Sequence, residues 1–130
     1  MIVGLGTDIV SMERIEKVLS RSPAQFIDRV CLETEKKYLQ DSGRDITARL
    51  SKIWAVKEAA TKALGTGFAQ GVKFSDIELR HDAAGKPELL FYGKALEILE
   101  QRTEGKGYNV VVSLSDDKPF AQAVVIIEKI

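Results

Sequence analysis

The sequence predicts an α+β fold, in which a small, largely antiparallel sheet packs against one long central helix. Three features indicate it. Residues 46–64 combine strong helix formers with apolar positions at helical spacing. Residues 72–91 and 108–127 each contain two strand-like runs separated by a turn sequence, which is typical of β-hairpins. Strands and helices are grouped without strict alternation, and 130 residues suit a single domain spanning residues 1–130.

The first expected element is a strand at residues 2–10, which is rich in β-branched and apolar side chains. Gly4 and Gly6 are unusual there, because glycine weakens a strand and often marks a close approach of another group to the backbone. Asp8 lies near the end of the strand among apolar neighbours.

Ser11 is a suitable N-cap for a following helix, whose apolar residues recur three and four apart. Another face of this helix carries Arg14, Lys17 and Arg21. Such a basic stripe is by itself most simply a solvated surface.

Two short helices are expected at residues 23–30 and 33–39, followed by a turn at 41–45. The long helix at 46–64 comes next, and Gly65 can end it by adopting a left-handed conformation. The expected buried stripe of this helix consists of Ile46, Leu50, Ile53, Trp54, Ala60 and Leu64.

Glu58 and Lys62 lie one turn apart on the long helix, which is the ordinary stabilising pair of a surface helix. The chain continues with a glycine-rich loop at 65–71, a strand within 72–82, a turn at 82–87 and a strand at 88–91. A helix at 92–101, a strand at 108–114, a turn at 115–119 and a final strand at 120–127 complete it. The last strand contains a continuous apolar run at residues 123–127, which predicts a central or doubly covered position.

Composition excludes several classes of function. Formal net charge is zero, so general attraction to nucleic acid or to an anionic membrane is not expected. Cys31 is the single cysteine and His81 the single histidine, which excludes an internal disulfide and a cysteine or histidine metal cluster. The first residues lack the pattern of a signal peptide and no apolar run is long enough to span a membrane, so a cytoplasmic protein is expected.

Familiar nucleotide and hydrolase motifs are incomplete, including the dinucleotide fingerprint, the P-loop and the serine triad. What remains is Asp8 in a glycine-bearing strand, together with Glu58 and Lys62 on a helix. Two carboxylates suit Mg²⁺, which keeps part of its hydration and takes other ligands from phosphate oxygens. A lysine one turn away is suitably placed for a phosphate, although spacing alone does not bring Asp8 next to Glu58.

Four stretches, in this order, resemble the holo-acyl-carrier-protein synthase family. They are GLGTDIV at residues 4–10 with Glu13-Arg14-Ile15, WAVKEAATKALGTG at 54–67, GKP at 85–87, and SLSDD at 113–117 with FAQAVV at 120–125. The resemblance covers essentially the whole chain. It implies the 4′-phosphopantetheinyl transferase fold and Mg²⁺-dependent transfer of the phosphopantetheine arm of coenzyme A to a serine of apo acyl carrier protein. Adenosine 3′,5′-bisphosphate would be released, and the implied role is in fatty acid biosynthesis.

The resemblance also implies roles for individual residues. Asp8 and Glu58 match magnesium ligands, and Lys62 matches the lysine that contacts the diphosphate. Either Glu58 or a metal-bound water is the implied base for the serine hydroxyl. The implied coenzyme contacts are Gly65, Gly67, Gly85, Lys86, Pro87 and Arg44.

Acyl carrier proteins are acidic, so Arg14 and Arg21 become expected partner contacts, with Lys17 a weaker one. Short members of the family are homotrimers with sites shared between subunits. Two departures stand out: Ile53 replaces an arginine, for which Lys52 could compensate, and Asp116 replaces a histidine. A contact to the coenzyme through that histidine is therefore not expected.

Two other kinds of protein remain open from the residues alone. A non-catalytic module would bind carrier or coenzyme without transfer. A structural domain with a surface Glu58–Lys62 pair would bind neither Mg²⁺ nor coenzyme.

Overall fold

The computed structural model describes residues 1–41 and 45–130. The chain runs through β1 (Ile2–Ser11), α1 (Met12–Arg21), α2 (Pro23–Val30), α3 (Glu33–Gln40) and α4 (Ile46–Leu64). The 3-10 turn η1 (Phe74–Asp76), β2 (Ile77–His81), β3 (Pro87–Phe91), α5 (Gly93–Arg102), β4 (Tyr108–Asp117) and β5 (Phe120–Lys129) follow. The predicted α+β class, with antiparallel sheets packed against a long helix, is confirmed.

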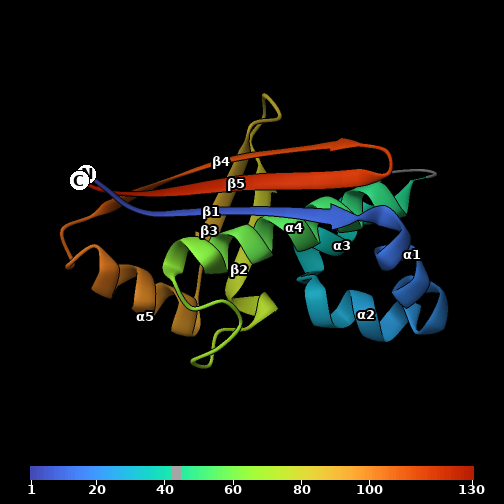
Figure 1. The fold of residues 1–130 in the computed structure, drawn as a ribbon, viewed down its shortest axis with the longest axis horizontal. Helices are drawn as coiled ribbons and strands as arrows, with labels where there is room; N and C mark the ends of the chain where they lie inside the picture. Colours follow the sequence, from blue (N-terminus) through green and yellow to red (C-terminus); the bar gives the residue numbers. More distant parts are fainter. Residues whose placement is uncertain (42–44) are drawn as a thin grey trace.

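A three-stranded antiparallel sheet in the order β1-β5-β4 forms one layer of the molecule (Figure 1). The central position predicted for the last strand is therefore correct. Its inward residues Ala121, Ala123, Val125 and Ile127 are buried, because alternate side chains of a strand point to the same face. α4 runs beneath this face and the other helices lie around it (Figure 1).

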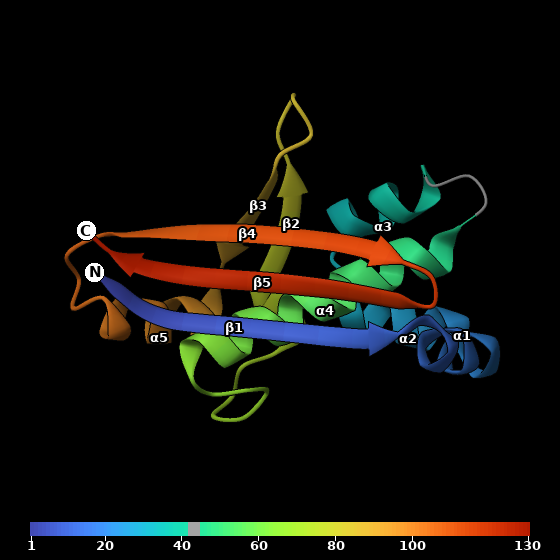
Figure 2. The same cartoon turned by 45° about the horizontal axis from the view of Figure 1, so that its top comes forward.

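The β2–β3 hairpin forms a separate two-stranded sheet. Figure 2 shows it crossing behind β4, with its tip projecting beyond the three-stranded sheet on the side away from β1. This places β1 and the hairpin on opposite sides of the central strand.

α4 begins and ends where the sequence predicts. The Asp45 carboxylate accepts a hydrogen bond from the Ala48 amide at 3.0 Å, and Gly65 ends the helix with a left-handed φ of 84°. Burial is wider than a single stripe, since twelve residues of α4 are buried on several sides. Two members of the predicted stripe differ: Ile46 is exposed and Trp54 is only partly buried.

Some predicted boundaries were wrong. β4 continues to Asp117, so the polar residues 115–117 belong to the ladder and not to the turn. Ser11 occupies the predicted N-cap of α1, but its side chain makes no capping hydrogen bond. Among the described residues, no helix combines the length and apolar character needed to cross a membrane.

Candidate active site

The backbone of β1 lies directly against α4. A Cβ atom added to Gly6 would overlap the carbonyl oxygen of Ala59 and lie 2.7 Å from the amide nitrogen of Ala63. A Cβ atom at Gly4 would likewise overlap the Ala63 carbonyl oxygen. The two glycines therefore allow another group to contact the backbone of β1 closely, as the sequence predicted. That group is the backbone of the long helix α4. We call this contact the glycine seam.

Asp8 lies on the same face of β1 as Gly4 and Gly6, because side chains two residues apart share a face. It therefore faces α4, where Lys62 projects from the seam. The Lys62 ammonium donates to the Thr7 carbonyl at 3.0 Å and forms an ion pair with Asp8 Oδ1 at 3.2 Å. Residues 54 positions apart in the sequence are thus brought together at one point.

Glu58 lies one turn before Lys62 and is partly buried. Its burial raises its pKa above the ordinary value, and the nearby Asp8 carboxylate raises it further, while Lys62 acts in the opposite direction. The seam therefore concentrates two carboxylates and one ammonium group.

Two neighbouring carboxylates fit Mg²⁺, which binds few protein ligands and keeps several waters. Asp8 and Glu58 provide such a pair. Within residues 1–41 and 45–130, no group of three or more His, Cys, Asp or Glu side chains is placed to hold a metal ion. The donor set thus suits an ion that takes its remaining ligands from water and phosphate, not one that needs a closed protein cage.

The end of α4 leads into the glycine-rich loop. Gly65 caps the helix, and the amides of Thr66 and Gly67 both donate to the Thr61 carbonyl, at 3.1 and 3.2 Å. Both glycines have positive φ, at 84° and 57°. The loop therefore starts about two turns after Glu58 and one turn after Lys62, where the sequence predicted it.

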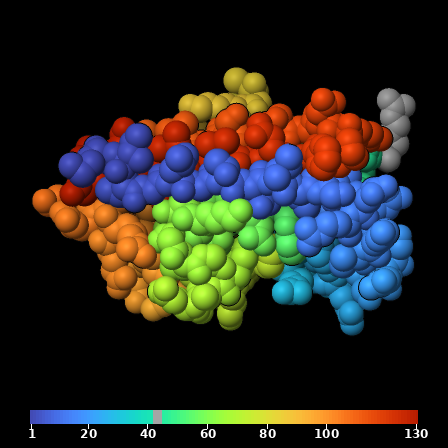
Figure 3. Space-filling model, in the orientation of Figure 1, coloured from blue at the N-terminus to red at the C-terminus, as the bar shows by residue number. Residues whose placement is uncertain are grey.

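The basic stripe of α1 borders a shallow pocket beside the seam. Exposed Arg14, Lys17 and Arg21 form its rim, and its volume is about 260 Å³. Its apolar lining consists of Val10, Ile15, Val18, Phe26 and Trp54. Figure 3 shows α1, in blue, beside β1 and the surface of α4 on this face of the molecule.

The remaining predicted coenzyme residues lie elsewhere in the chain. Gly85 is in the turn of the β2–β3 hairpin, with a φ of 87°, and Pro87 begins β3. Lys86 and Pro87 line a groove of about 420 Å³ between the hairpin and β4. One chain does not bring this groove to Asp8, because β5 separates β4 from β1. Arg44 lies outside the described residues.

The two positions that depart from the family pattern have clear structural settings. Ile53 is fully buried in the core, so its side chain makes no contact with solvent. Asp116 forms an ion pair with Lys52, with 3.1 Å between the carboxylate and the ammonium. The lysine suggested as a replacement for the missing arginine is therefore paired with the residue that replaces the histidine.

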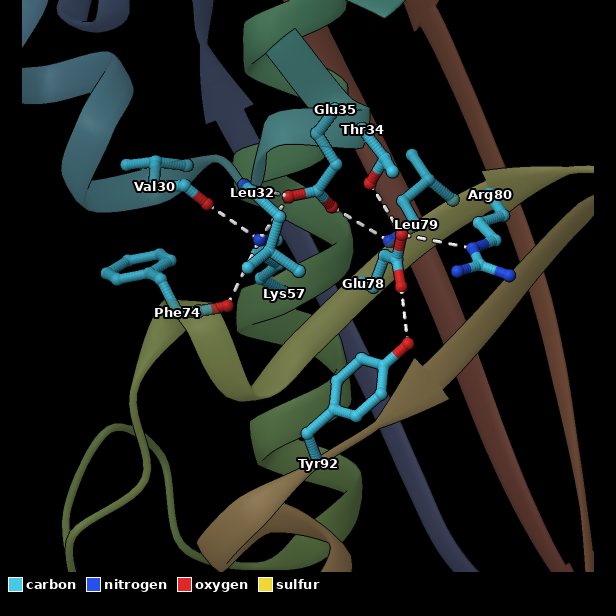
Figure 4. Close-up of polar contacts among 10 residues, drawn as sticks. All are labelled: Val30, Leu32, Thr34, Glu35, Lys57, Phe74, Glu78, Leu79, Arg80 and Tyr92. Atoms are coloured by element: carbon cyan, nitrogen blue, oxygen red, sulfur yellow. Dashed lines mark hydrogen bonds and ion pairs between the residues drawn. The ribbon is translucent and has the colours of Figure 1, made fainter. Parts of the chain in front are cut away.

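Lys57 and Glu35 form a buried ion pair that the sequence did not reveal (Figure 4). A lysine between alanine-rich turns of a helix is most simply solvent-exposed. The only hint was Glu35 three residues after Leu32, the spacing of a capping box, and in the structure the Leu32 amide donates to Glu35 at 2.8 Å.

Comparisons with known proteins identify the family of the chain. The sequence model of the 4′-phosphopantetheinyl transferase superfamily matches residues 4–122. A holo-[acyl-carrier-protein] synthase of Vibrio cholerae is 45% identical over 129 residues, covering 99% of both chains.

Solved structures are also similar. A holo-[acyl-carrier-protein] synthase of Neisseria meningitidis superimposes with a TM-score of 0.84 at 39% identity, over 99% of this chain and 100% of that one. A Bacillus anthracis enzyme of the same name, solved in complex with CoA (3′,5′-ADP), gives a TM-score of 0.81 at 36% identity, over 100% and 99%. This chain therefore belongs to the 4′-phosphopantetheinyl transferase superfamily and, within it, to the holo-[acyl-carrier-protein] synthases.

Proposed function

We propose that this protein transfers the 4′-phosphopantetheine arm of coenzyme A to a serine of apo acyl carrier protein. The reaction is Mg²⁺-dependent, releases adenosine 3′,5′-bisphosphate and supports fatty acid biosynthesis. The observation that carries the proposal is the glycine seam, which gathers Asp8, Glu58 and Lys62 in a chain 45% identical to a named synthase.

Each residue at the seam has a distinct role in this proposal. Asp8 and Glu58 would hold Mg²⁺, which neutralises charge on the coenzyme diphosphate when it is bound. Lys62 donates to the diphosphate and keeps it in line with the attacking hydroxyl. Gly65 and Gly67 let the coenzyme approach the backbone of the loop without a side chain in the way.

The α1 pocket is the proposed docking site for the carrier. Arg14, Arg21 and, more weakly, Lys17 attract an acidic partner, and charge complementarity of this kind acts mainly on the rate of association and on specificity. The apolar lining at Phe26 and Trp54 can receive an aliphatic side chain. Trp54 lies one turn before Glu58, so a carrier docked there is close to the reacting groups.

We also propose a homotrimer with sites shared between subunits. The outer face of the sheet exposes apolar side chains in a row across three strands, since Leu5 pairs with Ile126 and Ile126 with Val111. Leu5 and Val111 are 61% and 48% exposed, which is unusual for an unpartnered surface. In the trimer, the groove lined by Lys86 and Pro87 on one subunit would face the seam of another and supply further coenzyme contacts.

A cytoplasmic location is part of the proposal. Cys31 is buried, and as the single cysteine it gives the chain no internal disulfide, in keeping with a reducing compartment.

The direct test is incubation of the protein with coenzyme A, Mg²⁺ and an apo acyl carrier protein, followed by intact mass measurement of the carrier. The carrier should gain the mass of the arm, and chromatography should detect adenosine 3′,5′-bisphosphate in equal amount. Chelation of Mg²⁺ or Glu58→Gln should abolish the gain, while Glu100→Gln, an exposed carboxylate on α5, should not. Coenzyme binding without transfer to any carrier would instead identify a binding module.

A further inference from the structure

Lys57 and Glu35 are almost completely removed from solvent, at 0% and 1% side-chain exposure. Their side chains do not take part in the proposed chemistry, yet Lys57 immediately precedes Glu58. The Lys57 ammonium donates to Glu35 Oε1 at 2.7 Å, to the Val30 carbonyl at 2.6 Å and to the Phe74 carbonyl at 3.0 Å. All three of its protons are therefore used.

The Glu35 carboxylate is equally occupied. Oε1 also accepts from the Leu32 amide and Oε2 accepts from the Leu79 amide, both at 2.8 Å. The pair thus joins the end of α2, the start of α3, the middle of α4, η1 and β2 (Figure 4). We call these two residues and their four backbone partners the buried clamp.

Stability alone does not explain a buried ion pair, because apolar residues of similar volume often serve as well or better. The clamp differs from an apolar contact in being directional. Its hydrogen bonds fix the Val30 and Phe74 carbonyls relative to Lys57 of α4, and the Leu32 and Leu79 amides relative to Glu35 of α3.

One of the fixed groups, the Phe74 carbonyl, bears on the candidate active site through the glycine-rich loop. The Phe74 carbonyl marks the end of the loop that starts at Gly65 and Gly67, and the Phe74 ring stacks on Phe68 of that loop at 4.0 Å. The near end of the loop is held by the Thr61 carbonyl. Without Lys57, the far end would keep the ring contacts of Phe74 but lose its hydrogen bond to α4.

The buried clamp lies on the side of α4 opposite the glycine seam. The glycine seam leaves no room between the backbones of β1 and α4, and its glycines offer no side chain that could stop α4 from turning about its own axis. The orientation of α4 about that axis therefore depends on contacts on its other sides, such as the buried clamp. Lys57 is rotated by about 100° from Glu58 around the helix, so an anchor at Lys57 also fixes the direction in which Glu58 projects.

We propose that Lys57 and Glu35 are positioning residues, which hold the loop 65–73 and the face of α4 carrying Glu58 in the geometry that binds coenzyme. The inference rests on the proposed function for its kinetic part. It predicts that weakening the clamp raises the KM for coenzyme A more than it lowers kcat, and leaves the KM for the carrier nearly unchanged.

The test compares three variants with the wild type at a temperature where all are folded. Lys57→Met with Glu35→Gln removes both charges together and keeps an acceptor oxygen for the Leu32 amide. Glu35→Gln alone keeps the Lys57 hydrogen bonds to the Val30 and Phe74 carbonyls, so it disturbs the loop anchor less, although the buried ammonium loses its counter-charge. Leu99→Ala creates a cavity at a fully buried residue of α5 and is the control for lost stability alone.

Hydrogen exchange of the amides in residues 66–73 provides a measurement that needs no reaction. In the double variant these amides should exchange at least about tenfold faster, while those of β5 keep their rates. The KM for coenzyme A should rise by about tenfold or more. Glu35→Gln should change both quantities in the same direction by less, and Leu99→Ala should change neither.

The inference is overturned if the clamp variants lose stability as Leu99→Ala does but keep wild-type exchange in the loop and wild-type KM values. Failure of the proposed function looks different. In that case the wild type would not modify any carrier, while the exchange comparison would still decide whether the clamp holds the loop.

Discussion

Gly6→Ala tests whether the glycine seam builds the active site. Non-bonded atoms rest about 3.5–4 Å apart, whereas the new methyl carbon would lie 2.7 Å from the Ala63 amide nitrogen and closer still to the Ala59 carbonyl oxygen. Both obstacles are backbone atoms of a buried helix and cannot rotate away. β1 must therefore move from α4 by about 1 Å or more, at a cost of about 3 kcal/mol of unfolding free energy, the upper part of the usual range for overpacking.

The same movement separates Asp8 from Glu58 and Lys62, and a displacement of about 1 Å at reacting groups can lower the rate about 100-fold. Transfer of the arm to apo carrier, followed by mass spectrometry, measures the rate, and denaturant unfolding measures stability. Gly105→Ala is the control for losing a glycine without a clash, because a Cβ there meets nothing within 4 Å. Gly105 has a positive φ that Gly6 lacks, so the control carries about 1 kcal/mol of backbone strain of its own, which is subtracted. Wild-type activity and stability in Gly6→Ala would refute the reasoning.

Three further predictions concern single side chains. Glu58→Gln should stabilise the metal-free protein at neutral pH. The raised pKa of Glu58 means that the folded state binds the proton more tightly than the unfolded state does, so the free energy of unfolding of the wild type falls as pH rises above 4.5. Thermal unfolding in the presence of a chelator should therefore show that Glu58→Gln no longer stabilises the protein at pH values below this window. Arg14→Glu should raise the carrier KM by about tenfold in steady-state assays and leave the coenzyme KM unchanged, whereas an unchanged carrier KM would remove Arg14 from the docking surface. Leu5→Glu places a charge in the exposed apolar row and should reduce the assembly to monomers in size-exclusion chromatography with light scattering; an intact oligomer would place the interface elsewhere.

The sequence predicted those features that depend on local chemistry. α4 has its predicted bounds because Asp45 and Gly65 are strong capping residues in their own right. Gly4 and Gly6 correctly signalled a close approach. They could not identify the approaching group, since a missing side chain does not specify its neighbour.

Features that depend on residues distant in the sequence were missed, because local sequence does not specify such partners. Lys57 is buried because Glu35, 22 residues earlier, neutralises it and two backbone carbonyls complete its hydrogen bonds. Residues 115–117 have turn-like composition, but pairing with Phe120, Ala121 and Gln122 of β5 keeps them in the strand. In both cases tertiary contacts override the local preference.

The sheet order explains why one chain carries only part of the proposed site. Asp8 lies on one edge strand, and the groove with Lys86 and Pro87 borders the other, so two strand spacings of about 4.8 Å and the hairpin itself lie between them. No side chain spans that distance, so only a second subunit can bring such a groove to Asp8. A contact between two different surfaces is heterologous, and it gives a closed ring, as in the proposed trimer, where the rotation between subunits closes. In the proposed trimer, each subunit therefore completes the site of one neighbour, and the other neighbour completes its own. Transfer activity then depends on assembly. Leu5→Glu should lose transfer activity even though the substituted side chain faces away from Asp8.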